Sequence, residues 1–261
     1  MTKGGGRPGL QATQLVAGLH SVRTALSRSA SSVVELQVES QRRDQRIAEL
    51  IALAQKSDIP VNPIDRELLD RLLPGINHQG VAARIGIPPA QGESALENLL
   101  TGLDEPPFLL ILDGVQDPHN LGACLRSADG AGVHAVIAPK DRCVGLTPVV
   151  CKVASGAAQS TPFFQVTNLA RTLKQLKRDY NVWLIGTAGE SDQELYQADF
   201  SGPLGLVMGG EEKGLRRLTR EACDYLVRLP MRGAVESLNV SVATGICLYE
   251  AIRQRSLVNP D

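Results

Sequence analysis

The 261-residue sequence predicts an α/β protein with a small N-terminal α/β domain and a larger C-terminal domain built on a mainly parallel sheet. Short apolar runs alternate with segments at helical spacing throughout the second half, which is typical of parallel strands covered by helices on both faces. Helix and strand patterns also alternate over about the first 85 residues. Hydrophobic residues make up 43% of the chain, enough for a proper core.

Composition divides the chain into four regions. Residues 1–12 are glycine-rich without apolar periodicity, and we expect a flexible tail. Residues 13–87 form the first domain. Residues 88–106 are interpreted as a linker, because proline pairs bracket them and 91–106 hold four acidic and no basic side chains. A short amphipathic turn over 95–103 interrupts this linker, and residues 107–261 form the second domain.

The elements of the first domain follow from periodicity and from breaks in it. Residues Ile47, Leu50, Ile51 and Leu53 recur at helical spacing, for example. The expected elements are a helix over 18–26, a strand over 33–38, a helix over 44–56, an extended piece at 60–61, a helix over 66–73 and a strand over 80–85.

The second domain shows the alternation more clearly. Its expected strands are 108–112, 135–138, 182–186, 204–208 and 225–229, and its expected helices are 121–130, 148–158, 169–179, 214–222 and 238–255. The single tryptophan, Trp183, lies inside an apolar run and is interpreted as a core residue. In a sheet of this kind ligands bind at the carboxyl ends of the strands.

Charge and composition exclude several classes of protein. With 27 basic against 28 acidic residues, the chain is neither a strongly basic histone-like protein nor an acidic solubiliser. Aromatic residues are only 3%, which argues against a base-stacking platform. No run of 18 apolar residues and no secretion signal occur, and five scattered cysteines fit reduced thiols without metal-ligand spacing. These features predict a cytoplasmic protein without a membrane segment or a metal.

Three polar or glycine-rich segments remain as candidate sites, each directly after an apolar strand. They are 113–126, with Asn120 as a possible helix cap and Arg126 six residues on; 209–214; and 230–243, where Ser237 or Asn239 could cap the last helix. Each segment alone is typical of an ordinary capped helix. The P-loop, dinucleotide, zinc-protease and esterase motifs are absent from the sequence.

Taken together, the three segments resemble the ordered motifs of the SpoU/TrmH family of RNA ribose 2′-O-methyltransferases. The motifs are N-x5-R, then G-x-E-x-x-G, then P-M-x-G-x3-S-L-N-V-S-V-A, and the likeness covers essentially all of 107–261. The phrases VAGLHSVRTAL and NHQGVAARI resemble the ribosomal-protein-like substrate-binding domain of several members. The whole chain is most similar to the bacterial members that methylate a guanosine ribose in 23S rRNA.

The resemblance implies a fold feature, a cofactor and an assembly. Members of the family have a C-terminal trefoil knot (SPOUT type) and form homodimers through this domain, with the active site completed across the interface. They bind S-adenosyl-L-methionine in the knot loops. The matching positions in this sequence are Gly209, Leu229, Met231 and Leu238, with Thr187 a weaker candidate.

The resemblance also assigns catalytic roles. Arg126 is the central residue, either as a proton acceptor or, since guanidinium is effectively always protonated, as a cation that stabilises the developing alkoxide. Asn120 and Asn239 orient the arginine and the substrate, and Ser237 supports Asn239. Glu211 pairs with an arginine or braces the cofactor loop.

The partner is expected to be 23S rRNA or a pre-ribosomal particle. Two basic clusters are candidates for phosphate contacts or are solvated faces: 42, 43 and 46, and 213, 216, 217 and 220. Three alternatives stay open. They are the same chemistry on tRNA or another rRNA site, a non-catalytic RNA-binding protein with this fold, and, more distantly, a Rossmann-type oxidoreductase.

Overall fold

The structure is a computed structural model that describes residues 13–211 and 213–258. The tail expected over 1–12 lies outside the described residues. The chain divides into two compact units. Unit 1 comprises the described residues up to Pro89 with the stretch Ala158–Ser160, and unit 2 comprises the remainder.

Unit 1 is a four-stranded sheet with helices on both faces. The strand order is β1 (Thr13–Ala17), β4 (Val81–Gly86), β2 (Val33–Glu39) and β3 (Val61–Ile64). Strand β4 is antiparallel to both neighbours, whereas β2 and β3 are parallel because α2 (Gln45–Lys56) crosses between them. One core cluster joins α1 (Leu19–Arg28) and α2 to the sheet, and a second joins α3 (Arg66–Leu72) to its other face.

Unit 2 is a six-stranded sheet in which every pair of neighbours is parallel. The order is β10 (Tyr225–Val227), β8 (Trp183–Thr187), β9 (Leu204–Gly209), β5 (Phe108–Asp113), β6 (Ala135–Pro139) and β7 (Phe163–Val166). All six residues of β5 are buried, as a strand covered on both faces requires. The α/β class expected from the sequence is confirmed.

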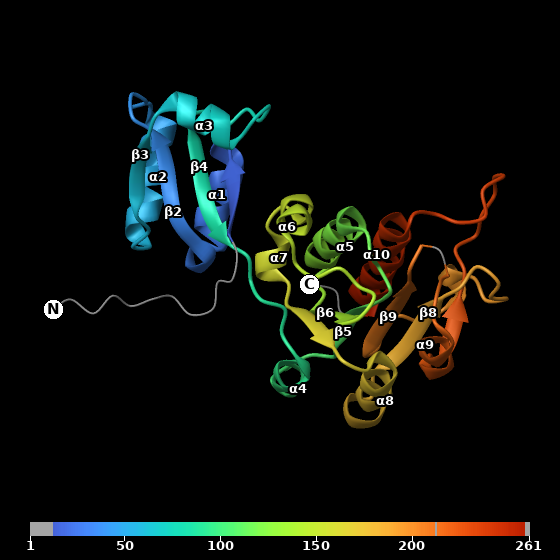
Figure 1. Ribbon diagram of the computed structural model, residues 1–261. Helices are drawn as coiled ribbons and strands as arrows, with labels where there is room; N and C mark the ends of the chain where they lie inside the picture. The colour runs from blue at the N-terminus through green and yellow to red at the C-terminus, as the bar shows by residue number, and fades with distance from the viewer. Residues whose placement is uncertain (1–12, 212, 259–261) are drawn as a thin grey trace. The chain divides into compact units, whose positions relative to one another are not determined.

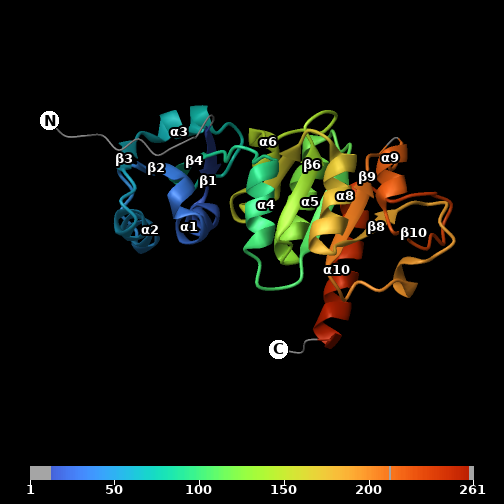
Figure 2. The same cartoon turned by 90° about the horizontal axis from the view of Figure 1, so that it is seen from below.

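Helices cover both faces of the unit 2 sheet. Figure 1 shows α5 (Pro118–Gly130) and α10 (Val240–Val258) on one side, and α4 (Glu93–Thr101) and α8 (Leu169–Tyr180) on the other. Figure 2 shows the same helices from below. The shorter helices are α6 (Pro148–Ala154), α7 (Ala157–Ser160) and α9 (Arg217–Ala222). Short 3-10 turns lie at Ala30–Ser32 and Leu195–Gln197.

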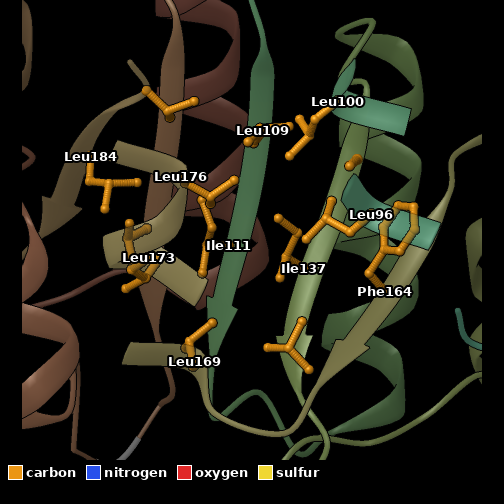
Figure 3. Packing of buried hydrophobic residues seen from close by; sticks show 14 of the residues in the cluster. Leu96, Leu100, Leu109, Ile111, Ile137, Phe164, Leu169, Leu173, Leu176 and Leu184 are labelled. Carbon is orange, nitrogen blue, oxygen red and sulfur yellow. The ribbon is translucent and has the colours of Figure 1, made fainter. Parts of the chain in front are cut away.

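The region expected to be a linker contributes to the core of unit 2. Helix α4 lies inside 88–106, and its Leu96 and Leu100 are buried against Leu109, Ile137 and α8 (Figure 3). The apolar spacing that suggested a short turn over 95–103 instead supports a packed helix. This stretch is therefore ordered by hydrophobic burial despite its linker-like composition.

Several details differ from the sequence expectations. Strands β1 and β7 were not expected, because each is short and borders residues with turn-like composition. The helix expected over 148–158 breaks after Ala154, where Ser155 and Gly156 have left-handed backbones. Trp183 was wrongly placed in the core: its exposed fraction is 56%, because it is the first residue of β8 and lies beside Tyr225 at the strand ends.

No helix within the described ranges is both long and apolar enough to cross a membrane. The trefoil knot stays a prediction.

Candidate active site

The three motif segments meet at the carboxyl edge of the unit 2 sheet. Asp113 at the end of β5 pairs in register with Gly209 at the end of β9. Gly186 of β8 lies opposite Val207 of β9, and Val227 of β10 lies opposite Thr187. Because the strands are parallel, the loops that follow β5, β9, β8 and β10 all leave from this one edge.

One asparagine joins all three segments. Asn120, buried in the first turn of α5, donates from Nδ2 to Oε1 of Glu211 at 2.5 Å. Its Oδ1 accepts a hydrogen bond from Nδ2 of Asn239 at 3.0 Å. A carboxylate can only accept, so Glu211 turns the amide of Asn120 and leaves the oxygen for Asn239. We call the chain Glu211–Asn120–Asn239 the amide network.

Helix capping explains why Asn120 is free to act in this way. The sequence pointed to Asn120 as the cap of its helix, and this is wrong: α5 begins two residues earlier, at Pro118, and Asp117 is the cap, accepting from the backbone N–H of His119 at 2.9 Å. Asn239, by contrast, does cap: its Oδ1 accepts from the backbone N–H and Oγ of Ser241, at 2.9 and 2.6 Å. The first turn of α10 thereby fixes the Asn239 side chain.

An ion pair with a buried carboxylate, which sequence reasoning missed, holds the loop after β9. Asp113 has a fully buried carboxylate that accepts from the backbone N–H of Arg216 at 2.9 Å and from its Nε at 2.5 Å. The carbonyl of Asp113 accepts from the N–H of Gly210 at 3.0 Å. The sequence did contain a signal for this ion pair, namely an aspartate at the carboxyl end of an apolar strand. A carboxylate buried at such a position requires a partner.

Two of the three glycines of this loop, Gly209 and Gly210, are required by close packing. A Cβ on Gly209 would lie 2.2 Å from the carbonyl carbon of Gly214, and one on Gly210 would lie 2.5 Å from the carbonyl oxygen of Gly114. Gly210 and Gly214 also form an isolated bridge across the loop. The G-x-E-x-x-G motif therefore describes a tight turn that aims Glu211 at Asn120.

Arg126 and Ser237 are not part of the amide network. Both side chains are exposed and make no hydrogen bond or ion pair within the described part of the chain. Arg126 follows Asn120 by six positions, which places the two residues about 9 Å apart along α5 and on different sides of it. The structure thus joins three of the five expected catalytic residues and leaves two apart.

The expected cofactor residues lie at neighbouring strand ends. Thr187 ends β8 and donates from Oγ1 to the carbonyl of Val207 at 3.5 Å, and Gly209 ends β9. Leu229 and Met231 follow β10 and are half-buried, while Leu238 is 36% exposed.

The segment after β10 fits the cofactor that the family implies. Among the described residues, the backbone groups of 229–238 have no hydrogen-bond partner. Half-buried aliphatic side chains beside free N–H and C=O groups suit S-adenosyl-L-methionine, whose adenine needs apolar cover and polar edges.

Ion pairs account for most of the basic cluster expected over 213–220. Arg216 pairs with Asp113, Arg217 with Glu221, and Arg220 with Glu190. In unit 1, Arg42 pairs with Asp44 at 2.6 Å, and His78 is buried against Asp70 at 2.9 Å. These side chains have structural partners, so the arginines of α9 are a poor match for a phosphate-binding surface.

Burial raises the pKa of each cysteine thiol. The pKa is raised to about 11 for Cys124 and Cys151, and to about 12 for Cys143, Cys223 and Cys247. All five are free thiols. Because they stay protonated at neutral pH, none is an activated nucleophile.

The sheet and the amide network define an α/β protein whose polar site lies at the carboxyl edge of parallel strands. The pattern of the SpoU rRNA Methylase family matches residues 107–249, and the pattern named RNA 2′-O ribose methyltransferase substrate binding matches residues 15–90. The chain belongs to the SpoU rRNA methylase family, which confirms the family expected from the three motifs.

Similar proteins cover nearly the whole chain. The 23S rRNA (guanosine-2′-O-)-methyltransferase RlmB of Ralstonia nicotianae is 53% identical over 249 residues, which are 94% of this chain and 98% of that protein. RlmB of Escherichia coli K12 is 51% identical over 244 residues, 94% of this chain and 100% of that protein. Among solved structures, the SpoU methyltransferase AviRb from Streptomyces viridochromogenes in complex with AdoMet has a TM-score of 0.74 at 25% identity, covering 93% of this chain and 90% of its own.

Proposed function

We propose that the protein transfers a methyl group from S-adenosyl-L-methionine to the ribose 2′-hydroxyl of a guanosine in 23S rRNA. The amide network at the carboxyl edge of the sheet carries this proposal, because it fixes three polar side chains from three separate motifs in one place. The relatives named 23S rRNA (guanosine-2′-O-)-methyltransferase, at 51% and 53% identity over almost their full length, support the substrate.

The division of labour follows the two units. Residues 13–87 bind the RNA, and residues 107–261 carry the methyl transfer. The match of 15–90 to a substrate-binding pattern supports the first role, and the match of 107–249 supports the second. The protein acts in the cytoplasm, where rRNA or an assembling ribosomal particle is its partner.

Positioning supplies most of the catalysis. S-adenosyl-L-methionine, when bound by Thr187, Gly209, Leu229, Met231 and Leu238, presents an electrophilic methyl group on a sulfonium. A ribose hydroxyl is a poor nucleophile, and holding it in line is worth up to about 7–11 kcal/mol. Asn120 and Asn239 orient the ribose through their fixed amides, and Glu211 holds Asn120 in the required orientation.

Charge stabilisation is the role of Arg126. A guanidinium is effectively always protonated, so Arg126 acts as a cation near the oxygen charge that develops as the 2′-hydroxyl releases its proton to solvent and takes the methyl group, with S-adenosyl-L-homocysteine as the leaving group. Arg126 is not in contact with the amide network of its own chain, and its exposed position on α5 suits a site completed by a second copy. The protein is a homodimer in which Arg126 of one protomer serves the amide network of the other.

Labelled cofactor tests the function directly. Purified protein is incubated with radiolabelled S-adenosyl-L-methionine and, separately, with unmodified 23S rRNA, 16S rRNA and bulk tRNA, and the labelled nucleoside is identified after digestion. We expect 2′-O-methylguanosine from 23S rRNA alone. Label in tRNA would overturn the substrate but keep the chemistry. Failure to bind S-adenosyl-L-methionine would overturn the enzyme activity itself.

A further inference from the structure

The loop between β6 and α6 carries two basic residues that the fold leaves without an anionic partner. Lys140 and Arg142 are exposed, and neither makes an ion pair within the ranges that the structure describes. The acid between them, Asp141, is also exposed and pairs with neither. This contrasts with α9 and the residue before it, where three arginines are neutralised by carboxylates.

The backbone of this loop is anchored at both ends, at β7 and next to the turn that bears Glu211. Lys140 donates its N–H to the carbonyl of Val166 at 2.8 Å, and Val144 donates to Val115, two residues after β5, at 3.1 Å. The carbonyl of Arg142 lies 4.0 Å from where a Cβ of Gly114 would be, and Gly210 packs against the same Gly114. The loop and the turn that bears Glu211 therefore converge on one residue.

Two further observations concern the loop at Arg142 and Cys143. Burial is the main cause that raises the pKa of the neighbouring Cys143, and the carboxylates of Asp113 and Glu211 add smaller contributions, so this part of the loop is within electrostatic reach of both. Arg142 also has a φ of 62°, in the left-handed region that a branched or long side chain rarely occupies. This conformation costs free energy for a residue other than glycine, and such residues are found at binding sites as well as at helix ends.

We propose that Arg142, assisted by Lys140, binds a phosphate of the RNA backbone next to the ribose that is methylated. A 2′-hydroxyl within an RNA chain is flanked by phosphodiesters, so a substrate seated at the amide network brings a phosphate to the neighbouring loop. A guanidinium contacts phosphate oxygens with two parallel N–H donors, and an ammonium adds a point charge. This inference rests on the proposed function. It assigns the phosphate contact to the loop between β6 and α6, because the arginines of α9 are already paired with carboxylates.

The test compares four variants with the wild-type protein. Arg142→Ala and Lys140→Ala remove one charge each, Arg142→Lys keeps the charge without the two-pronged donor, and Lys174→Ala removes a charge from α8 on the other face of the sheet. Each is assayed for its Michaelis constant toward the RNA substrate, for kcat at saturating RNA, and for binding of S-adenosyl-L-methionine. Dissociation constants for RNA are measured in parallel by filter binding, at several salt concentrations.

We expect Arg142→Ala to raise both the RNA dissociation constant and the Michaelis constant about tenfold, with Lys140→Ala weaker and Arg142→Lys intermediate. The slope of log affinity against log salt should fall by about 0.7 for one lost phosphate contact. Binding of S-adenosyl-L-methionine should be unchanged, and Lys174→Ala should behave as wild type. Unchanged RNA affinity and salt slope in Arg142→Ala, or an equal loss in Lys174→Ala, would overturn the inference. Because RNA binding is read directly, absence of methyl transfer in the wild type would count against the proposed function alone.

Discussion

Asn120 occupies the centre of the site because one primary amide can satisfy two partners of opposite kind. Its NH2 group donates to the carboxylate of Glu211, and its carbonyl accepts from Asn239. Aspartate at this position would have no donor for Glu211 at neutral pH, and leucine would have neither group. This explains in physical terms why an asparagine, and no similarly sized residue, can link the three motifs.

Replacing Arg126 tests the cationic role at the scale of one side chain. We expect Arg126→Ala to lower kcat about 100- to 1,000-fold, because a preorganised charge at a developing oxyanion is lost. Binding of S-adenosyl-L-methionine should not change, since the exposed Arg126 side chain makes no hydrogen bond to any of the proposed cofactor residues in the described part of the chain. Single-turnover methyl transfer at saturating RNA measures the effect, with Arg126→Lys as the charge-conserving control. Full transfer by Arg126→Ala with normal RNA binding would contradict this role.

The turn after β9 shows how an element fixes a functional side chain. Asp113 holds the turn from two sides, through the N–H of Gly210 and through Arg216. The glycines of the turn allow its backbone to lie so close to neighbouring backbone that no Cβ would fit between them. Glu211 reaches Asn120 only because the turn is closed in this way. The glycines of the motif therefore serve the packing of the turn, and its glutamate serves the site.

Adding one methyl group to this turn should therefore impair function. Gly209→Ala places a Cβ 2.2 Å from Gly214, and the turn must open to accommodate it. We expect a loss of about 1–3 kcal/mol in the free energy of unfolding, and at least tenfold weaker S-adenosyl-L-methionine binding, measured by urea denaturation and calorimetry. Gly202→Ala is the matched control, because nothing lies within 4 Å of its added Cβ. Equal behaviour of the two variants would show that the turn tolerates a side chain.

Helix α4 has no proposed role in the chemistry, and its burial leads to a prediction about stability. Leu100 is buried in a core cluster of unit 2 although its surroundings have a linker composition. We expect Leu100→Ala to lower the free energy of unfolding by about 2–5 kcal/mol, the usual range for a buried leucine. Ser94→Ala, at an exposed position of the same helix, should change it by less than about 0.5 kcal/mol. A small effect of Leu100→Ala would mean that 88–106 acts as a linker after all.

Features that depend on local sequence could be predicted, whereas features that depend on contacts between distant parts of the chain could not. The apolar runs at 108–112 and 204–208 predicted the central strands, and the motif order predicted which loops meet. The exposed Trp183 was misplaced because an apolar run does not reveal where its strand leaves the core. The link from Asp113 to Arg216 spans 103 positions of the chain, and no periodicity reports a pairing over that separation.

At the scale of the whole molecule, the proposed homodimer would let Arg126 of one chain reach the amide network of a second copy. Arg126 lies on α5, and the neighbouring α10 exposes Val242 and Tyr249, which are 50% and 56% accessible in the single chain. Apolar side chains on such a helix suit burial against a second copy. A twofold dimer formed there would bring the α5 helices of both protomers to the interface and allow each Arg126 to serve the partner's amide network.

Mixing two inactive variants tests whether the site is shared. Arg126→Ala and Asn239→Ala, carrying different affinity tags, are co-expressed and the doubly tagged dimers are purified. In a shared site, each mixed dimer has one site with both defects and one intact site, so we expect about half of the wild-type activity per dimer. Each variant alone should be nearly inactive. If every site were built within one protomer, the mixed dimers would be as inactive as their parents, because each chain would still lack one of its own two residues. Analytical ultracentrifugation of the same samples establishes that the mixed species are dimers, so that a lack of activity reports on the site and not on assembly.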